Sequence, residues 1–206
     1  MIGFLFIGII LGLSAGFSPG PLLALVISET LQYGVRSGIK VALSPILTDL
    51  PIILITFLAL SELAHLQPLL GLISLGGGVF LVLLARQNFR PVAALPADLQ
   101  TRPKSLSKGV LTNALSPHPY LFWFSVGAPT LNRAITGGWP GGVGFLLGFY
   151  SCLVGAKILL AILAGRSRAF LSGPVYRIIM RVLGLLLILL AVILFRDGLR
   201  LLQVID

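Results

Sequence analysis

The sequence predicts an all-α integral membrane protein with six transmembrane helices, arranged as an inverted repeat of two three-helix halves with broken first and fourth helices. Hydrophobic residues make up 57% of its 206 residues and charged residues 10%, and the mean hydropathy is +1.05. A soluble domain could not bury that much apolar surface, so the expected solvent is the bilayer. The other two observations are recurring apolar segments of about 18 residues or more, enough for a hydrocarbon core of about 30 Å, and a proline motif found in both halves.

The chain is predicted to form one transmembrane domain, residues 1–206, with a polar linker between its halves. The expected spans are residues 2–27, 41–63, 68–85, 109–131, 142–164 and 175–202. The first run lacks a basic n-region and an A-x-A-like cleavage site, which favours a retained span over a secretory signal. Residues 86–108 contain three prolines and five basic side chains, and they separate residues 1–85 from residues 109–206.

Helix-breaking residues lie inside the first and fourth expected spans. Ser18-Pro19-Gly20-Pro21 interrupts the first, and Ser116-Pro117-His118-Pro119 interrupts the fourth. Backbone groups freed at membrane depth are tolerated only where protein buries them or a wet cavity solvates them. Matching interruptions in two halves therefore indicate a binding site between those halves. The alternative is a chance recurrence in a chain with 13 prolines.

The basic residues are distributed unevenly. The loop after the first expected span holds Glu29, Arg36 and Lys40, and the loops after the first, third and fifth spans together hold eleven of the 15 basic residues. Only three lie on the other side. The positive-inside rule then places the linker in the cytoplasm and both termini on the non-cytoplasmic side. The net charge of +9 accordingly indicates a membrane surface as partner rather than nucleic acid.

Two ionisable residues lie well inside the expected spans. Asp49 falls near the middle of the second span, where an ionisable group costs on the order of 3 kcal/mol and is read first as functional. Its alternative role is a structural carboxylate that caps backbone freed by Pro45 and Pro51. Lys157, in the fifth span, has Asp49 as its expected partner, or its side chain snorkels to the nearby interface.

The breaks contribute further polar groups. His118 changes its charge near neutral pH, which suits a proton carrier, although a lone histidine is also commonly a hydrogen-bonded structural residue. A half-helix that starts after Pro19-Gly20-Pro21 directs free N–H groups toward the gap, which suits a carboxylate, whereas Asp49 suits an amine. The neutral hydrogen-bonding side chains in this layer, which bind a ligand or satisfy freed backbone, are Ser18, Ser44, Thr48, Asn113 and Ser116.

Several enzyme classes are disfavoured. There is no phosphate-loop motif, and two histidines, one cysteine and six carboxylates make no recognisable metal-ligand set. Nothing resembles a Ser-His-Asp or Cys-His arrangement, and the lone Cys152 excludes an intrachain disulfide. We expect no enzymatic activity and no cofactor.

Phe17-Ser18-Pro19-Gly20-Pro21, followed by Gly34-x-x-x-Gly38 and the intramembrane Asp49, resembles the lysine exporter (LysE/RhtB) family of bacterial amino-acid exporters. The stretch from Gly109 to Asn113, leading to Ser116-Pro117-His118, is similar to that family's fourth-span motif. The resemblance implies six spans in a bacterial inner membrane, an inverted repeat, proton-driven export of amino acids or related small metabolites, and a homodimer. The family's usual acidic Gly-x-x-x-Gly-Asp pattern and fourth-span Asn-Pro-Lys are altered here, so the substrate is open and Lys157 is a candidate replacement for the missing lysine.

The leading hypothesis is a secondary exporter that alternates access to a midplane site for a zwitterionic solute. The expected site residues are Ser18, Pro19, Gly20, Pro21, Asp49, Asn113, Ser116, Pro117, His118, Pro119 and Lys157, with Asp49 and His118 as proton carriers and no metal ligands. The alternatives are an inorganic cation exporter, for which Asp49 would be a weak lone anchor, and a non-transporting membrane scaffold subunit.

Overall fold

Helices form all the regular structure in the part of the chain that the computed structural model describes, which is residues 2–58, 67–89, 104–167 and 173–203. In chain order the elements are α1 (Ile2–Phe17), α2 (Pro21–Tyr33), α3 (Val35–Ala42), α4 (Ser44–Leu58), α5 (Gln67–Phe89), α6 (Ser105–Ala114), α7 (Pro117–Phe122), the π-helical turn η4 (Trp123–Gly127), α8 (Ala128–Thr136), α9 (Trp139–Ser167) and α10 (Gly173–Leu201). The all-α prediction is confirmed for these residues.

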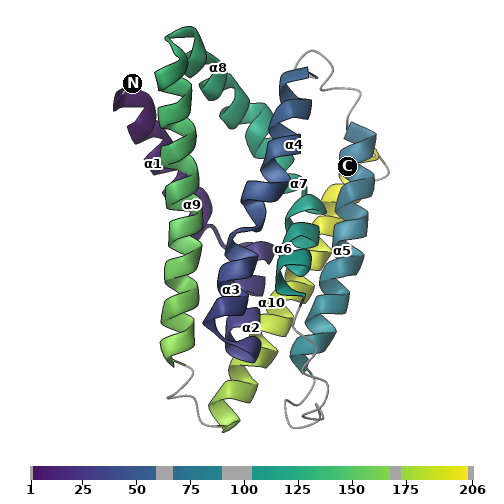
Figure 1. The fold of residues 1–206 in the computed structure, drawn as a ribbon. Coiled ribbons are helices and arrows are strands. Elements are labelled where there is room, and N and C mark those ends of the chain that lie inside the picture. The colour runs from purple at the N-terminus through teal and green to yellow at the C-terminus, as the bar shows by residue number, and fades with distance from the viewer. Residues whose placement is uncertain (1, 59–66, 90–103, 168–172, 204–206) are drawn as a thin grey trace.

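The chain runs back and forth between two ends of an elongated bundle (Figure 1). One end, where α1 begins and α10 ends, is called here the terminal end; the opposite end, where α2 and α5 end and α6 begins, is called the basic end. The described basic residues on helix segments near the basic end are Arg36, Lys40, Arg86, Lys104, Lys108, Arg166, Arg177 and Arg181. Those near the terminal end, again among the described residues, are Arg133, Arg196 and Arg200.

Several helices have the length and composition of membrane spans. Val35–Thr56, Trp139–Ser167 and Arg177–Leu201 each qualify within the described ranges, and α1 with α2 forms a fourth candidate that is bent by 63°. The apolar part of α5, Gly71–Arg86, is shorter. Large apolar side chains remain exposed along these helices, as expected where lipid is the solvent. The chain is therefore a multi-pass membrane protein, while the arrangement as six spans in an inverted repeat stays a prediction.

Glycines allow the backbones of helices that pack along each other to come close. α1 packs along α9, and a Cβ added at Gly8, Gly12 or Gly16 would meet atoms of Phe149, Cys152 or neighbouring α9 residues. α5 packs along α10. Small residues promote such backbone approach between membrane helices, where lipid removes the usual hydrophobic driving force.

The turn predicted between the first two spans is wrong. The first span was expected to end near residue 27, but α2 continues to Tyr33 and buries Glu29, which is 1% exposed. Arg36 and Lys40 lie in α3 rather than in a loop. The helix continues because Glu29 has ionic and hydrogen-bonding partners on α6, which sequence spacing does not reveal. The expected linker is also shorter in the structure, since α5 reaches Phe89 and α6 begins at Ser105; residues 90–103 lie outside the described residues.

Candidate functional site

The two predicted helix breaks are present. α1 ends at Phe17 and α2 begins at Pro21, so the interruption covers Ser18, Pro19 and Gly20. In the second half α6 ends at Ala114 and α7 begins at Pro117. Proline is well suited to the first turn of a helix because its missing N–H has no partner there in any case. Each motif therefore ends one helix and starts another.

Local groups satisfy the backbone at the second break. The backbone N–H of Ser116 donates to the Asn113 carbonyl at 3.2 Å, and the Tyr120 hydroxyl donates to the Ala114 carbonyl at 2.9 Å. The Leu115 carbonyl oxygen rests against Gly77 of α5, at the point where a Cβ on residue 77 would collide with it. Gly77 therefore lets the backbone between α6 and α7 approach α5 closely.

The first break depends on a lysine from a distant helix. Lys157 of α9 is 4% exposed, and its Nζ donates to the carbonyl oxygens of Gly16 at 3.1 Å and of Ala15 at 3.4 Å. Pro19 has no N–H to offer Ala15, the residue four positions before it, and α1 ends before Gly16 gains a partner. An ammonium at the last carbonyls of a helix also interacts favourably with the negative end of its dipole. Lys157 is thus a cap for α1, and the snorkelling alternative is wrong.

Asp49 lies in α4, where side chains from the second half hold it. It is 4% exposed, and its Oδ1 accepts from Asn113 Nδ2 of α6 at 3.1 Å. Its Oδ2 accepts from the Tyr150 hydroxyl of α9 at 3.4 Å, and Thr48 donates to Oδ1 at 3.4 Å. Because these partners are side chains, capping of freed backbone is not what holds Asp49. The carbonyl of Val41, which Pro45 leaves free, instead accepts from the Ser44 hydroxyl at 2.7 Å.

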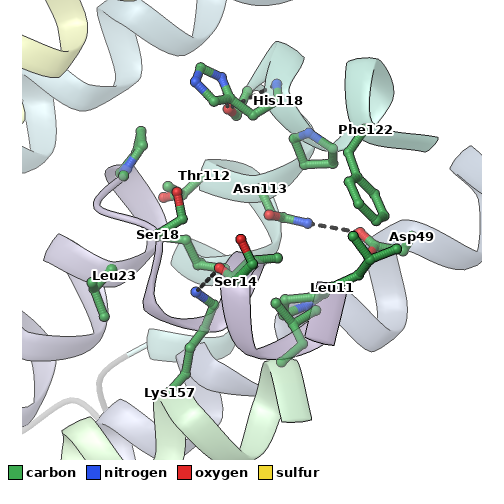
Figure 2. Close-up of a pocket in the computed structure, with 18 of the residues that line it drawn as sticks. Leu11, Ser14, Ser18, Leu23, Asp49, Thr112, Asn113, His118, Phe122 and Lys157 are labelled. Atoms are coloured by element: carbon green, nitrogen blue, oxygen red, sulfur yellow. Dashed lines mark hydrogen bonds between the residues drawn. The ribbon is translucent and has the colours of Figure 1, made fainter. Parts of the chain in front are cut away.

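The predicted Asp49–Lys157 ion pair is wrong. The lysine turns toward the carbonyl end of α1, whereas the aspartate turns toward Asn113 and Tyr150, so each group has partners of its own. Figure 2 shows the two side chains on different sides of the pocket, with Asn113 beside Asp49. The separation leaves a negative and a positive group on different walls of one cavity.

A cavity of about 400 Å³ lies between the breaks. Ten of the eleven expected site residues line it: Ser18, Pro19, Gly20, Pro21, Asp49, Asn113, Ser116, His118, Pro119 and Lys157. Pro117 does not line it, since it is buried at the start of α7. The structure therefore brings both motifs and both charged groups to one pocket; their part in function stays a prediction.

His118 lies at the exposed rim of this pocket. Its backbone N–H donates to the Ser116 hydroxyl at 3.4 Å, and its ring Nδ1 lies 3.5 Å from the same oxygen. This contact places Ser116 as the N-cap of α7. The imidazole is thus reachable from outside the pocket, unlike Asp49.

Other lining residues were not predicted. Much of the wall is apolar, formed by Leu11, Phe122, Val126, Phe149 and Leu153. Thr112 is 3% exposed, and its hydroxyl has no hydrogen-bond partner among the described residues. Ser14 lies four residues before Ser18, about one helical turn, so this spacing could have indicated it.

The fold and pocket define a class: a multi-pass helical membrane protein with a partly polar cavity where two interrupted helices meet. The family of LysE type translocators matches residues 13–198, nearly the whole chain, and the chain belongs to that family. The family resemblance proposed from the sequence motifs is thereby confirmed. LysE type translocators form a transporter family rather than an enzyme family. No curated protein and no solved structure matches the chain.

Proposed function

We propose that this protein is a secondary exporter of amino acids or closely related zwitterionic solutes, which it moves by exposing the pocket to each side of the membrane in turn. The observation that carries the proposal is the single cavity lined by both helix breaks, Asp49 and Lys157. Interrupted helices that border a midplane cavity are typical of secondary transporters. Membership of a translocator family agrees with this.

The chemistry of the pocket suits a zwitterion. The ammonium of the solute would lie at Asp49, and its carboxylate would lie toward Lys157 and the first turn of α2. At that turn Pro21 has no N–H, and the free N–H groups that follow it carry the positive end of the α2 dipole. A solute with one charge of each sign would complement the pocket without adding net charge to a site of low dielectric.

The helix contacts support two inverted halves of three spans each. The contacts that join the halves include α1 with α9, α4 with α6 and α5 with α10. Inverted halves would be related by an axis in the membrane plane that exchanges the first span with the fourth, the second with the fifth and the third with the sixth. Such an axis would place the α1–α9 contact on the α4–α6 contact, and it would place the α5–α10 contact on itself. Such symmetry is the usual basis of alternating access.

Orientation and energy source complete the proposal. The excess of basic residues at the basic end favours a cytoplasmic location for that end, with both termini on the other side of a bacterial inner membrane. A proton that enters from the terminal end, by way of His118 at the pocket rim, would neutralise Asp49 as the solute leaves. The homodimer implied by the family resemblance stays a prediction.

The test is efflux from vesicles that contain the purified protein, loaded with a panel of labelled amino acids. We expect efflux of at least one zwitterionic solute, faster when an inwardly directed proton gradient is imposed, and loss of that efflux in Asp49→Asn. Thr56→Val is the matched control, because it removes one buried hydrogen bond from the same helix outside the pocket. Efflux by Asp49→Asn at the wild-type rate would reject the role of Asp49, and no efflux of any zwitterion would reject the function.

A further inference from the structure

A charged cluster joins the two halves away from the pocket. Glu29 of α2 is 1% exposed, and its Oε1 lies 2.6 Å from Nζ of Lys108 of α6. The Ser105 hydroxyl, also on α6, donates to the other carboxylate oxygen at 2.5 Å. The Lys108 ammonium also lies 5.3 Å from the centre of the Tyr33 ring. The transport mechanism above makes no use of this cluster.

The cluster lies between the pocket and the basic end. The pocket lining stops at Leu23 on α2 and at Thr112 on α6. Glu29 is six residues beyond Leu23, about 9 Å at 1.5 Å per residue, and Lys108 is four residues before Thr112, about 6 Å. In the other direction the lining includes Val126, beyond the second break. The cavity therefore extends toward the terminal end and is closed on the basic side.

Close packing completes this closure. A Cβ at Gly109 of α6 would lie 3.1 Å from the Cα of Val41 and 2.9 Å from the Ser44 hydroxyl oxygen. Leu25 and Val26 of α2 belong to the same buried core cluster as Val41. The helices α2, α3 and α6 thus meet without a gap at the level of the charged cluster.

We propose that Glu29, Ser105 and Lys108 form the gate that closes the pocket on its basic side. Glu29 is buried and Lys108 partly buried, and an ion pair withdrawn from water is commonly no more stable than a well-packed apolar contact, so its presence at this seam needs another reason. When the seam parts, water enters and solvates both charges, whereas parted apolar faces would be exposed to that water at a cost. A charged seam can therefore close and open with a smaller difference in free energy than an apolar one.

The test uses access to the pocket and needs no transported solute, although the inference rests on the proposed function. A single cysteine is introduced by Ser18→Cys, at an exposed residue that lines the pocket, in a Cys152→Ser background, and a membrane-impermeant thiol reagent is applied from the basic side or the terminal side. With the gate intact we expect labelling from the terminal side and slow labelling from the basic side. Glu29→Gln and Lys108→Met, each of which removes one charge of the pair, are expected to raise basic-side labelling at least tenfold.

Two further variants make the result specific. Lys104→Met removes an exposed positive charge from the start of the same helix and is expected to leave labelling unchanged. The exchange Glu29→Lys with Lys108→Glu restores the pair, since the Ser105 hydroxyl can accept as well as donate, and is expected to return basic-side labelling to slow. Basic-side labelling that stays slow in both single variants would overturn the gate, as would an increase that the exchange does not reverse. Rapid basic-side labelling before any gate substitution would also overturn it. Absence of labelling from either side in every variant would reject the water-filled pocket and the gate together.

Discussion

Lys157→Met tests how the first break is held. Methionine keeps most of the length of the lysine side chain and much of its packing, but it has no donor for the carbonyls of Ala15 and Gly16. A buried acceptor without a partner costs about 1–3 kcal/mol. Two effects reduce this loss: the variant no longer buries an ammonium, and pocket water can reach part of the freed backbone. We therefore expect the free energy of unfolding to fall by about 2 kcal/mol, near the middle of that range.

The assay is thermal unfolding of the purified protein in detergent, followed by loss of monodisperse protein. On the scale of soluble proteins of about 150–250 residues, 2 kcal/mol corresponds to a fall in Tm of about 4–8 °C. Lys157→Arg keeps donors at this position and is expected to lose less. Ser151→Ala, an exposed change on the same helix, should stay within about 0.5 kcal/mol of the wild type. A Lys157→Met protein as stable as Ser151→Ala would refute the capping role.

Three other predictions follow from the pocket and its supports. Gly77→Ala drives a Cβ into the Leu115 carbonyl oxygen, so it should abolish efflux or prevent accumulation of folded protein, whereas Gly76→Ala meets only a methyl group of Leu115 at 4.0 Å and should be tolerated in both assays. Asn113→Leu removes a hydrogen bond to Asp49, and a loss of about 1.5–3 kcal/mol corresponds to an initial efflux rate roughly 10- to 150-fold lower; a rate within twofold of wild type would contradict this. Since Asp49 is the only carboxylate among the residues lining the described pocket, lysine should compete for efflux at least about tenfold less well than leucine, and equal competition would contradict this charge argument.

The proline motifs made the position of the site predictable. A single proline inside an apolar run can be accommodated within a helix, as Pro51 is in α4. Two prolines within three residues remove two backbone donors, which favours a full break, so both breaks were predictable from the sequence alone. The residues beside each break then fell into one pocket because both breaks lie at a similar depth in the bundle. Asp49 was predictable for the same physical reason, since a carboxylate in a membrane span requires polar partners.

The partners of the charged groups were not predictable. Opposite charge made Asp49 the obvious partner for Lys157, but the free carbonyls at the end of α1 are closer competitors and become visible only once α1 lies along α9. The sequence predicts a loop at Glu29, since the burial of this residue depends on Lys108, 79 residues further along the chain. Pairings of this kind are set by helix packing, which leaves no periodic signal in a single sequence.

Substrate protection of a cysteine in the pocket tests the central claim most directly. Ser14 is an exposed residue that lines the cavity, so Ser14→Cys in a Cys152→Ser background should react with a hydrophilic thiol reagent. The solute that the protein exports should slow this reaction several-fold, while labelling at Ser107→Cys, on the exposed surface of α6 and outside the pocket, should not change. Equal labelling of Ser14→Cys with and without a saturating transported solute would contradict the assignment of this cavity as the solute site.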